Sequence, residues 1–417
     1  MAFFKKTTLA LSLMAAASVT QAATPSNEEM WALLQQVQQQ LNEVKQQNQE
    51  LKVENKTLKT KVEQTEQTAN AAHETAEAVA EATESAVKLA SNSKTTIGGY
   101  GEMHFNSLND QHGTSDVDEI DFHRFVLYVG HEFNDRLRLF SELEVEHGVV
   151  EGGSGAVELE QAYIQYDISD TSRVSAGVFL LPIGLINETH EPTTFYGTER
   201  NLVEKNIIPT TWWEGGAMLS GELAQGFSYD LAFTSGLETS ATSNYKIRNG
   251  RGQVAAATAK DPAYTGRLKW TAIPGVELAA SAQYQNDVTQ GLDATAGSAT
   301  LFETHAVIQQ GAFGLRALYA TWDLDGAGPA SIGADEQTGW YVEPSYKIND
   351  KVGLFTRYSL WDNQAGNSSD TEYTQWDIGM NWWLDPQVVV KLDYQDQSSP
   401  VGQAELDGVN LGLGYQF

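Results

Sequence analysis

The sequence contains no cysteine among its 417 residues, which excludes disulfides and any metal site built from thiolates. Beyond residue 22, no apolar run reaches the roughly 18 residues that a membrane-spanning helix needs. Positive charge is also scarce, since 26 Lys and Arg stand against 55 Asp and Glu. The resulting net charge of −29 argues against a nucleic-acid partner.

Catalytic motifs are missing as well. Beyond residue 22 there is no glycine-rich phosphate loop, no HExxH and no nucleophile-elbow sequence, so neither an enzyme nor a cofactor is expected. The eight histidines are scattered and none pairs with another at ligand spacing. The acidic stretch 116–121 offers hard oxygen ligands for calcium, but it lacks the glycine turn of a calcium loop. A solvated acidic loop is the simpler interpretation.

The N-terminus has the three parts of a secretory signal. Lys5 and Lys6 precede a short apolar run from Leu9 to Val19, and small residues close the segment before a cut after Ala22. An uncleaved anchor and a buried core helix are the alternatives, but the run is too short to span a bilayer. We therefore predict a signal peptide over residues 1–22 of an exported protein.

Residues 23–95 are expected to form a periplasmic coiled coil and a linker. Residues 27–90 contain no glycine and repeat at alternating spacings of three and four, which is a heptad pattern. The first half of this stripe comprises Met30, Leu34, Val37, Leu41, Val44, Asn48, Leu51, Asn55, Leu58 and Val62. A single solvated helix or a disordered linker would leave the stripe unburied, so self-association is favoured. Asparagine at two a positions is often a dimer signal.

From residue 96 the pattern changes to short alternating segments. In the last of them, Val409, Leu411, Leu413 and Tyr415 alternate with polar or small residues. A soluble sandwich alternates too, but in a membrane barrel the apolar face meets lipid and the polar face meets water. Lipid tolerates no open sheet edge, so a chain this polar that spans a membrane must be a closed barrel.

The connections predict how many strands there are. Seven tight turns, near residues 134, 170, 225, 274, 310, 349 and 385, alternate with eight longer polar stretches at 109–119, 151–156, 182–211, 237–262, 286–300, 325–337, 362–372 and 397–405. Fifteen connections imply sixteen antiparallel strands over residues 96–417, with short turns at one end and long loops at the other. A barrel of this size encloses an aqueous channel. Tryptophans near strand ends, and the terminal Phe417, suit the aromatic girdles of an outer-membrane barrel.

Four stretches resemble the phosphate-selective porin O and P family: 121–125, 159–164, 177–184 and 210–216. The similarity extends from about residue 96 to the C-terminus. It implies a homotrimer in the outer membrane, in contact with lipid and lipopolysaccharide, and loops that fold inward to narrow each pore. It also implies that the long loop 182–211 forms the constriction, with Glu188, His190, Glu191, Glu199, Arg200, Glu204 and Lys205. A loop that caps the outside of the barrel is the alternative.

The charges depart from that family's arginine ladder and central lysines. From residue 96 onward there are 17 Lys and Arg against 44 Asp and Glu. Alternation places Arg124, Arg138, Arg267, Lys269, Arg316, Arg357 and Lys391 on the polar, pore-lining face. Leu318 and Ala320 make the phase of Arg316 ambiguous. The same polar face carries Glu142, Glu144, Glu146, Asp230, Glu277, Glu343, Asp377 and Asp393.

These charges favour a porin for passive diffusion of ions and small hydrophilic solutes, with weak cation selectivity or near-neutral behaviour. The alternative is a porin selective for phosphate or another small anion, in which Arg124, Arg267, Lys269, Arg357 and Lys391 converge at one height. A barrel lipase or protease would need a nucleophile and base that no motif supplies, and a trimeric adhesin contributes far fewer strands per chain. The coiled coil is long enough to approach peptidoglycan, but no binding motif supports such a contact.

Overall fold

The computed structural model describes residues 94–417 apart from 114, 150–152 and 154, together with scattered residues between 27 and 61, which are all helical. The chain divides into two units, with the boundary between Asn92 and Ser93. The expected signal peptide lies outside the described residues, as do most positions of the expected coiled coil. Among the described residues, no helix combines the length and the apolar character needed to cross a membrane.

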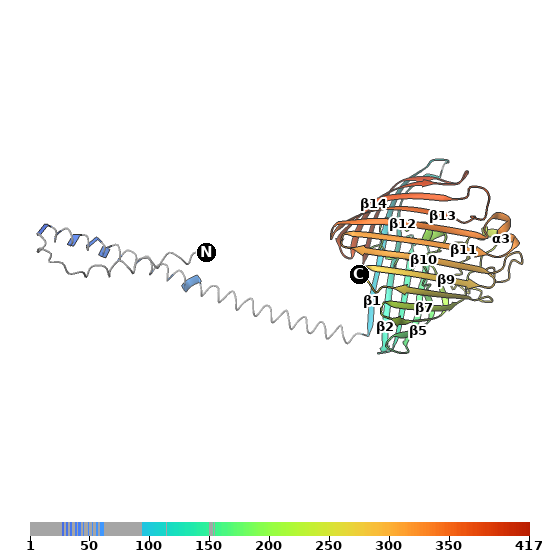
Figure 1. The fold of residues 1–417 in the computed structure, drawn as a ribbon, viewed down its shortest axis with the longest axis horizontal. Coiled ribbons are helices and arrows are strands. Elements are labelled where there is room, and N and C mark those ends of the chain that lie inside the picture. The colour runs from blue at the N-terminus through green and yellow to red at the C-terminus, as the bar shows by residue number, and fades with distance from the viewer. Residues whose placement is uncertain are drawn as a thin grey trace. The chain divides into compact units, whose positions relative to one another are not determined.

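The second unit is a closed barrel of sixteen antiparallel strands, in which each strand pairs with its neighbours in sequence and β1 pairs with β16 (Figure 1). The strands are β1 (Thr95–Asp110), β2 (Val117–Asn134), β3 (Leu137–Glu146), β4 (Val157–Asp167), β5 (Ser172–Leu180), β6 (Trp213–Ala224), β7 (Phe227–Thr234), β8 (Ala263–Trp270), β9 (Val276–Gln285), β10 (Ala299–Gln310), β11 (Phe313–Leu324), β12 (Glu336–Asn349), β13 (Val352–Asp362), β14 (Tyr373–Asp385), β15 (Val388–Ser398) and β16 (Leu406–Gln416). The predicted sixteen-stranded barrel is confirmed.

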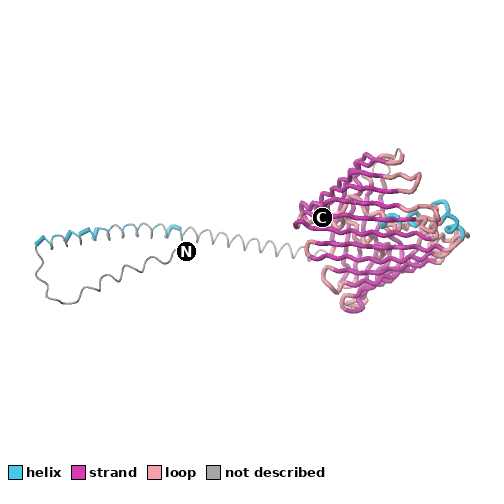
Figure 2. The backbone as a smooth tube through the Cα atoms, turned by 45° about the horizontal axis from the view of Figure 1, so that its top comes forward, coloured by secondary structure: helices cyan, strands magenta, loops and turns pink. Residues whose placement is uncertain are grey.

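Short and long connections alternate around the barrel. The long loops are L1 (111–116), L2 (147–156), L3 (181–212), L4 (235–262), L5 (286–298), L6 (325–335), L7 (363–372) and L8 (399–405). L3 contains the short helix α2 (Val203–Asn206), L4 contains the 3-10 turns η1 (Ala241–Ser243) and η2 (Ile247–Gly250), and L6 contains α3 (Ala327–Ile332). In Figure 2 helical turns lie at one end of the barrel, the loop end, and the C-terminus lies at the opposite, turn end.

Alternation along the strands separates an apolar outer face from a polar inner face. On β15, Lys391 and Asp393 are buried inside the barrel, whereas Leu392 and Tyr394 are exposed on the outside. The period of two follows from the pleat, which points successive side chains to opposite faces of a sheet. The outer face therefore suits lipid, and the inner face carries charge and hydrogen-bonding groups.

The inner face is apolar in one sector, on β10 to β13. Leu318, Ala320, Trp322 and Tyr341 are buried there against Ile207 and other apolar residues of L3. This explains the ambiguous phase of β11, because Arg316 shares the inner face with apolar residues that L3 covers. The interior cluster also includes three tryptophans that the sequence suggested for interfacial girdles, namely Trp212, Trp322 and Trp361.

Candidate functional site: the lumen and its inward loop

L3 turns into the barrel and is fastened to its inner wall. Thr193 donates a hydrogen bond to Gln416 (2.8 Å), and Asn381 donates to the carbonyl of Phe195 (2.9 Å). The backbone N–H of Thr198 donates to a carboxylate on β15 (2.5 Å). Because these partners lie on β14 to β16, while other parts of L3 contact β2 and β8, the loop crosses the lumen.

The last strand leaves room for this crossing by presenting glycine to the lumen. A Cβ atom on Gly414 would collide with Pro192, and one on Gly412 would lie 3.1 Å from Thr198. Glycine and apolar residues therefore alternate in β16 because its two faces have different requirements. The apolar residues face outward, and the glycines let the L3 backbone approach the wall.

Glu204, on α2, organises the fold of L3 itself. Its buried carboxylate accepts hydrogen bonds from the backbone of Leu185 (2.8 Å) and Ile186 (2.6 Å), from Tyr341 (2.8 Å) and from Asn201 (3.2 Å). Burial raises the pKa of Glu204, while these donors lower it, and the net shift is upward. The sequence suggested Glu204 for the constriction, but the structure gives it a supporting position away from water.

Most cations of the inner face are paired with carboxylates. The guanidinium of Arg124 contacts Glu102 (2.5 Å) and donates to the carbonyl of His190 (2.6 Å). Arg357 forms ion pairs with Glu343 and Asp377, at 3.1 Å each. Arg267 forms ion pairs with Asp230 on the wall (2.7 Å) and with Glu188 of L3. Arg138 forms an ion pair with Asp167. Lys269 lies 3.8 Å from Glu277.

The remaining two of the seven strand cations that the sequence placed on the pore-lining face contact L3. Arg316 donates to the carbonyl of Thr194 (2.7 Å), and the Lys391 ammonium lies 3.6 Å from the centre of the Phe195 ring. Lys391 is buried beneath the loop. The strand cations therefore do not form a free basic ring at one height, and several of them hold L3 in place.

The carboxylates suggested by the sequence are divided between the wall and the loop. On β3, Glu142 and Glu144 are buried, and Glu144 and Glu146 line the cavity at the loop end. Buried Asp393 on β15 accepts the Thr198 hydrogen bond. On L3, Glu191 accepts a hydrogen bond from Tyr128 (3.4 Å).

Glu199 of L3 reaches back to the first strand. Its carboxylate accepts a hydrogen bond from Asn106 (3.2 Å) and contacts His104 (2.8 Å). Burial raises the pKa of Glu199, but the charge and hydrogen bond of His104 lower it well below its ordinary range. Glu199 is therefore a carboxylate that stays ionised while it ties L3 to β1.

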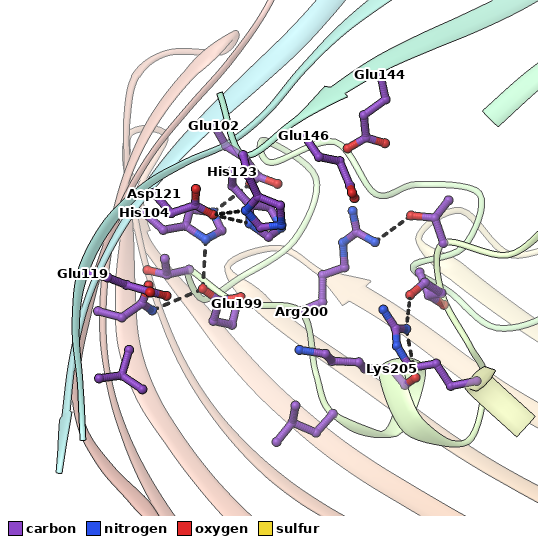
Figure 3. Close-up of a pocket in the computed structure, with 18 of the residues that line it drawn as sticks. Glu102, His104, Glu119, Asp121, His123, Glu144, Glu146, Glu199, Arg200 and Lys205 are labelled. Atoms are coloured by element: carbon purple, nitrogen blue, oxygen red, sulfur yellow. Dashed lines mark hydrogen bonds and ion pairs between the residues drawn. The ribbon is translucent and has the colours of Figure 1, made fainter. Parts of the chain in front are cut away.

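A cavity of about 570 Å³ opens at the loop end, and we call it the vestibule. Its walls carry eight carboxylates, Glu102, Glu119, Asp121, Glu144, Glu146, Glu158, Glu160 and Glu199, and three histidines, His104, His123 and His147. Four cations come from the loops: Arg200 and Lys205 from L3, and Arg248 and Arg251 from L4. In Figure 3 the labelled acidic and histidine side chains extend from the upper part of the view to its left and middle, and Lys205 lies at the lower right.

Arg200, Lys205, Arg248 and Arg251 together form what we call the loop cluster. Its three arginines donate hydrogen bonds to neutral oxygen atoms. Arg200 donates to the Thr211 hydroxyl (2.7 Å), Arg248 to the Thr210 carbonyl (2.8 Å) and Arg251 to the Thr211 carbonyl (2.5 Å). Such acceptors do not neutralise the arginines. The fourth member of the cluster is a lysine, and its pKa is lowered by desolvation and by the charges of the neighbouring arginines, against the opposing effect of Glu199.

A second cavity, of about 540 Å³, opens at the turn end. Its charged lining is balanced: five basic residues, Arg136, Arg138, Arg173, Arg267 and Lys269, face five acidic ones, Asp135, Asp167, Asp170, Glu222 and Asp230. The barrel thus has a cavity at each end, with L3 inside it.

Reasoning from the sequence missed the contribution of L4. The sequence does contain a signal for this contribution, which is a local concentration of basic residues in a barrel that is poor in them. Six residues of one long loop include Lys246, Arg248 and Arg251. It also missed Glu160, which alternates with apolar residues on β4. The meeting of the three vestibule histidines had no local signal, because strand pairing brings them together.

Comparison with known proteins agrees with this architecture. A relative, an uncharacterized protein of Aquifex aeolicus (strain VF5), is 29% identical over 345 residues, which cover 72% of this chain and 74% of the relative. Among solved structures, the outer membrane channel DcaP of Acinetobacter baumannii is 14% identical with a TM-score of 0.56, and the match covers 78% of this chain and 97% of that one. The anion-selective porin from Comamonas acidovorans is 11% identical with a TM-score of 0.56, covering 78% and 99%.

OmpT of Vibrio cholerae in its trimer form is 12% identical with a TM-score of 0.52, and the match covers 78% of this chain and 99% of that one. At these identities the solved structures show a shared fold. The family described as phosphate-selective porin O and P matches residues 96–417, which form the barrel. The chain therefore belongs to the phosphate-selective porin O and P family, and it is an outer-membrane channel.

Proposed function

We propose that this channel lets ions and small hydrophilic solutes diffuse passively through a lumen that L3 narrows. One observation carries the proposal: L3 crosses the inside of the barrel, with a cavity of about 570 Å³ at one end and about 540 Å³ at the other. A solute must pass between L3 and the polar wall, so the charges on these two surfaces act on it at short range.

Weak cation selectivity, or near-neutral behaviour, follows from the charges that line the two cavities. Carboxylates outnumber cations by eight to four around the vestibule, and the turn-end cavity is balanced. Low-dielectric walls focus the field of these groups, whereas charges on outer loops are screened beyond about 8 Å at physiological salt. The paired strand arginines add little to this balance.

A second candidate is selectivity for a small anion, and the loop cluster of Arg200, Lys205, Arg248 and Arg251 favours it. This cluster differs from a basic constriction built on the strands, because loops supply every member. The similar porin from Comamonas acidovorans is described as anion-selective. Four clustered cations on one side of the vestibule would hold an anion that passes the carboxylates opposite.

Liposome swelling tests the diffusion function. Purified protein in liposomes should admit uncharged sugars at rates that fall steadily with increasing molecular size, without saturation. Liposomes with heat-denatured protein control for leakage. Swelling with no neutral solute, combined with saturable uptake of one anion, would contradict passive diffusion.

We further propose that the barrel assembles as a homotrimer and that residues 23–95 extend into the periplasm as a coiled coil. The trimer form of the similar OmpT supports the threefold assembly, and the heptad stripe supports association below the barrel. In this arrangement the long loops face outward toward lipopolysaccharide, and the helical segment approaches peptidoglycan. The signal peptide over residues 1–22 would direct export.

A further inference from the structure

Three potential ligand groups meet beneath L3. Glu142 on β3, Glu160 on β4 and His190 on L3 place one ligand atom each within 4.8 Å of one another. The side chain of His190 is only 3% exposed, and those of Glu142 and Glu160 are 1% and 2% exposed. The loop thus meets the wall here through one imidazole and two carboxylates.

The distances suit an ion better than direct contact between these groups. His190 Nε2 lies 3.4 Å from Glu142 Oε1 and 3.4 Å from Glu160 Oε2. Charge-assisted hydrogen bonds are shorter, about 2.7–2.9 Å. By contrast, two ligands of a tetrahedral zinc ion, with bonds of about 2.0–2.2 Å, are separated by roughly 3.3–3.6 Å.

Two of the ligand atoms lack a hydrogen-bond partner. Within the described part of the barrel, neither His190 Nε2 nor Glu160 Oε2 has one. Buried polar atoms are nearly always satisfied, and an orphaned one calls for a bound water or ion. A single proton on Nε2 points at only one of the two carboxylates, whereas a cation contacts both.

Supporting hydrogen bonds orient the ligands. The Nδ1 atom of His190 lies 3.0 Å from the carbonyl of Asn187, and it must donate because a carbonyl only accepts. In the neutral ring, Nε2 is then left with its lone pair facing the carboxylates, as in metal-bound histidines. Glu142 is held through its other oxygen by Gln161 (2.6 Å). The Asn187 side chain in turn donates to two backbone carbonyls, which fixes the loop around His190.

The local charge also favours a cation. Glu144 lies near Glu160 and contributes a third acidic group. The nearby Arg124 directs its Nε to Glu102 and an Nη to the backbone of His190. The carboxylates of Glu142 and Glu160 each lie 3.4 Å from His190 Nε2, so the site attracts positive charge. Buried carboxylates without such a charge cost free energy, and a metal ion supplies it in place of the proton.

We propose that Glu142, Glu160 and His190 bind one divalent transition-metal ion, best matched by Zn²⁺, and that this ion fastens L3 to the barrel wall. One imidazole nitrogen and two carboxylate oxygens are a ligand set that zinc accepts, with water in the remaining position. The metal binding does not depend on the proposed transport function. Its effect on conductance rests on that function, because it assumes that L3 narrows the pore.

The test uses the full-length mature protein, purified in detergent and stripped with a chelator. After incubation with Zn²⁺ and removal of excess, mass spectrometry of the metal should give one ion per chain. Co²⁺ in place of Zn²⁺ should produce the visible absorption of a low-coordinate site. Glu160→Gln and His190→Gln should lose stoichiometric binding, and Gln161→Ala, which removes a supporting bond, should weaken affinity about 10–100-fold.

A matched control is His147→Gln, since His147 belongs to a more exposed group with Asp121 and His123 in the vestibule. This variant should keep the buried ion. Heat-dependent gel mobility verifies that each barrel has folded, and Glu160→Gln preserves side-chain volume if the histidine variant does not fold. Wild-type protein that retains no more metal than Glu160→Gln would overturn the site, and would assign a bound proton to His190 instead.

Single-channel recording separates the two parts of the proposal. Chelator should increase open-channel noise in the wild type and leave Glu160→Gln unchanged. If the wild type binds one metal ion per chain but chelator does not change its open-channel noise, the metal site is retained and its role in fastening L3 is overturned. Graded uptake of neutral sugars remains an independent test of transport.

Discussion

Arg357 and Arg138 both lie on the inner wall of the barrel, but they differ in how far their side chains are exposed to solvent. The side chain of Arg357 is 4% exposed between Glu343 and Asp377, whereas that of Arg138 is 39% exposed beside Asp167. Arg357→Met leaves two buried carboxylates without a cation, and we expect a loss of about 3–5 kcal/mol in unfolding free energy. For Arg138→Gln we expect a loss within about 1 kcal/mol.

Unfolding by guanidinium chloride in detergent micelles, followed by tryptophan fluorescence, measures the loss of unfolding free energy in both variants. Equal losses in the two variants would show that the stability of the barrel does not depend on the buried partners of Arg357. Arg357 would then be available to ions in the pore, which would favour a basic constriction on the strands.

We expect Lys205 to make anion permeability depend on pH. Desolvation and the neighbouring charges of Arg248 and Arg200 lower its pKa from the ordinary value of 10.5, against the effect of Glu199, so it loses its charge at a lower pH than an ordinary lysine does. The permeability ratio of chloride to potassium should therefore fall as pH rises through a range below 10.5. Lys205→Arg should remove that part of the pH dependence, because arginine stays charged.

Lys246→Arg, an exposed change on L4, is the control for this measurement and should keep the wild-type profile. The difference between wild type and Lys205→Arg isolates the lysine from the histidines of the same cavity. Identical pH profiles for those two proteins would exclude Lys205 from the conducting path.

Among the elements, we expect L3 to determine how much of the lumen is open. Deleting residues 193–201 removes the segment that contacts Gln416, Asn381 and Asp393 on the wall. Single-channel conductance in planar bilayers should rise markedly, because the deletion removes the part of L3 that reaches β14 to β16 across the lumen. Deleting residues 400–403 of L8 is the control. Unchanged conductance in a correctly folded L3 variant would mean that L3 does not limit the current.

The strands were predictable from the sequence because their signals are local. A period of two, bounded by turn residues, is enough to identify a segment such as Val388–Ser398 and to assign its faces. The path of L3 had no such signal, because it depends on contacts between residues far apart in the chain, such as Thr198 and Asp393. The apolar inner face near Leu318 is explained only by the loop that covers it.

The same limit applies to the charged groups of the lumen. Alternation assigned Arg124 and Glu142 to the inner face, but their partners depend on strand register and on L3. Register places Glu102 opposite Arg124, and the loop brings His190 to Glu142. Residue identity therefore indicated which groups face inward, and only the fold shows how they are paired.

At the scale of the whole molecule, the proposed coiled coil should strengthen the proposed trimer. Linking three barrels through residues 27–90 raises their effective concentration, and each apolar heptad layer adds buried area. Mature full-length protein should therefore dissociate from trimer to monomer at a higher temperature than a variant lacking residues 27–90. Sedimentation in detergent measures the assembly before and after heating.

A variant with the three changes Leu34→Ser, Leu41→Ser and Leu51→Ser provides the matched control, since it keeps the length of the segment but not its stripe. It should behave like the deletion. A full-length dimer in sedimentation, or equal dissociation temperatures for all three proteins, would contradict association of three chains through this segment.

The proposed weak selectivity of the channel is tested most directly by the reversal potential of single channels in a potassium chloride gradient, with the wild-type protein at neutral pH. If the eight carboxylates around the vestibule outweigh the four loop cations, the potential should be small and of the sign for weak cation preference, or close to zero. Added phosphate should not block the current. Strong anion preference, with block by submillimolar phosphate, would contradict this expectation and would show that the cluster of Arg200, Lys205, Arg248 and Arg251 governs permeation.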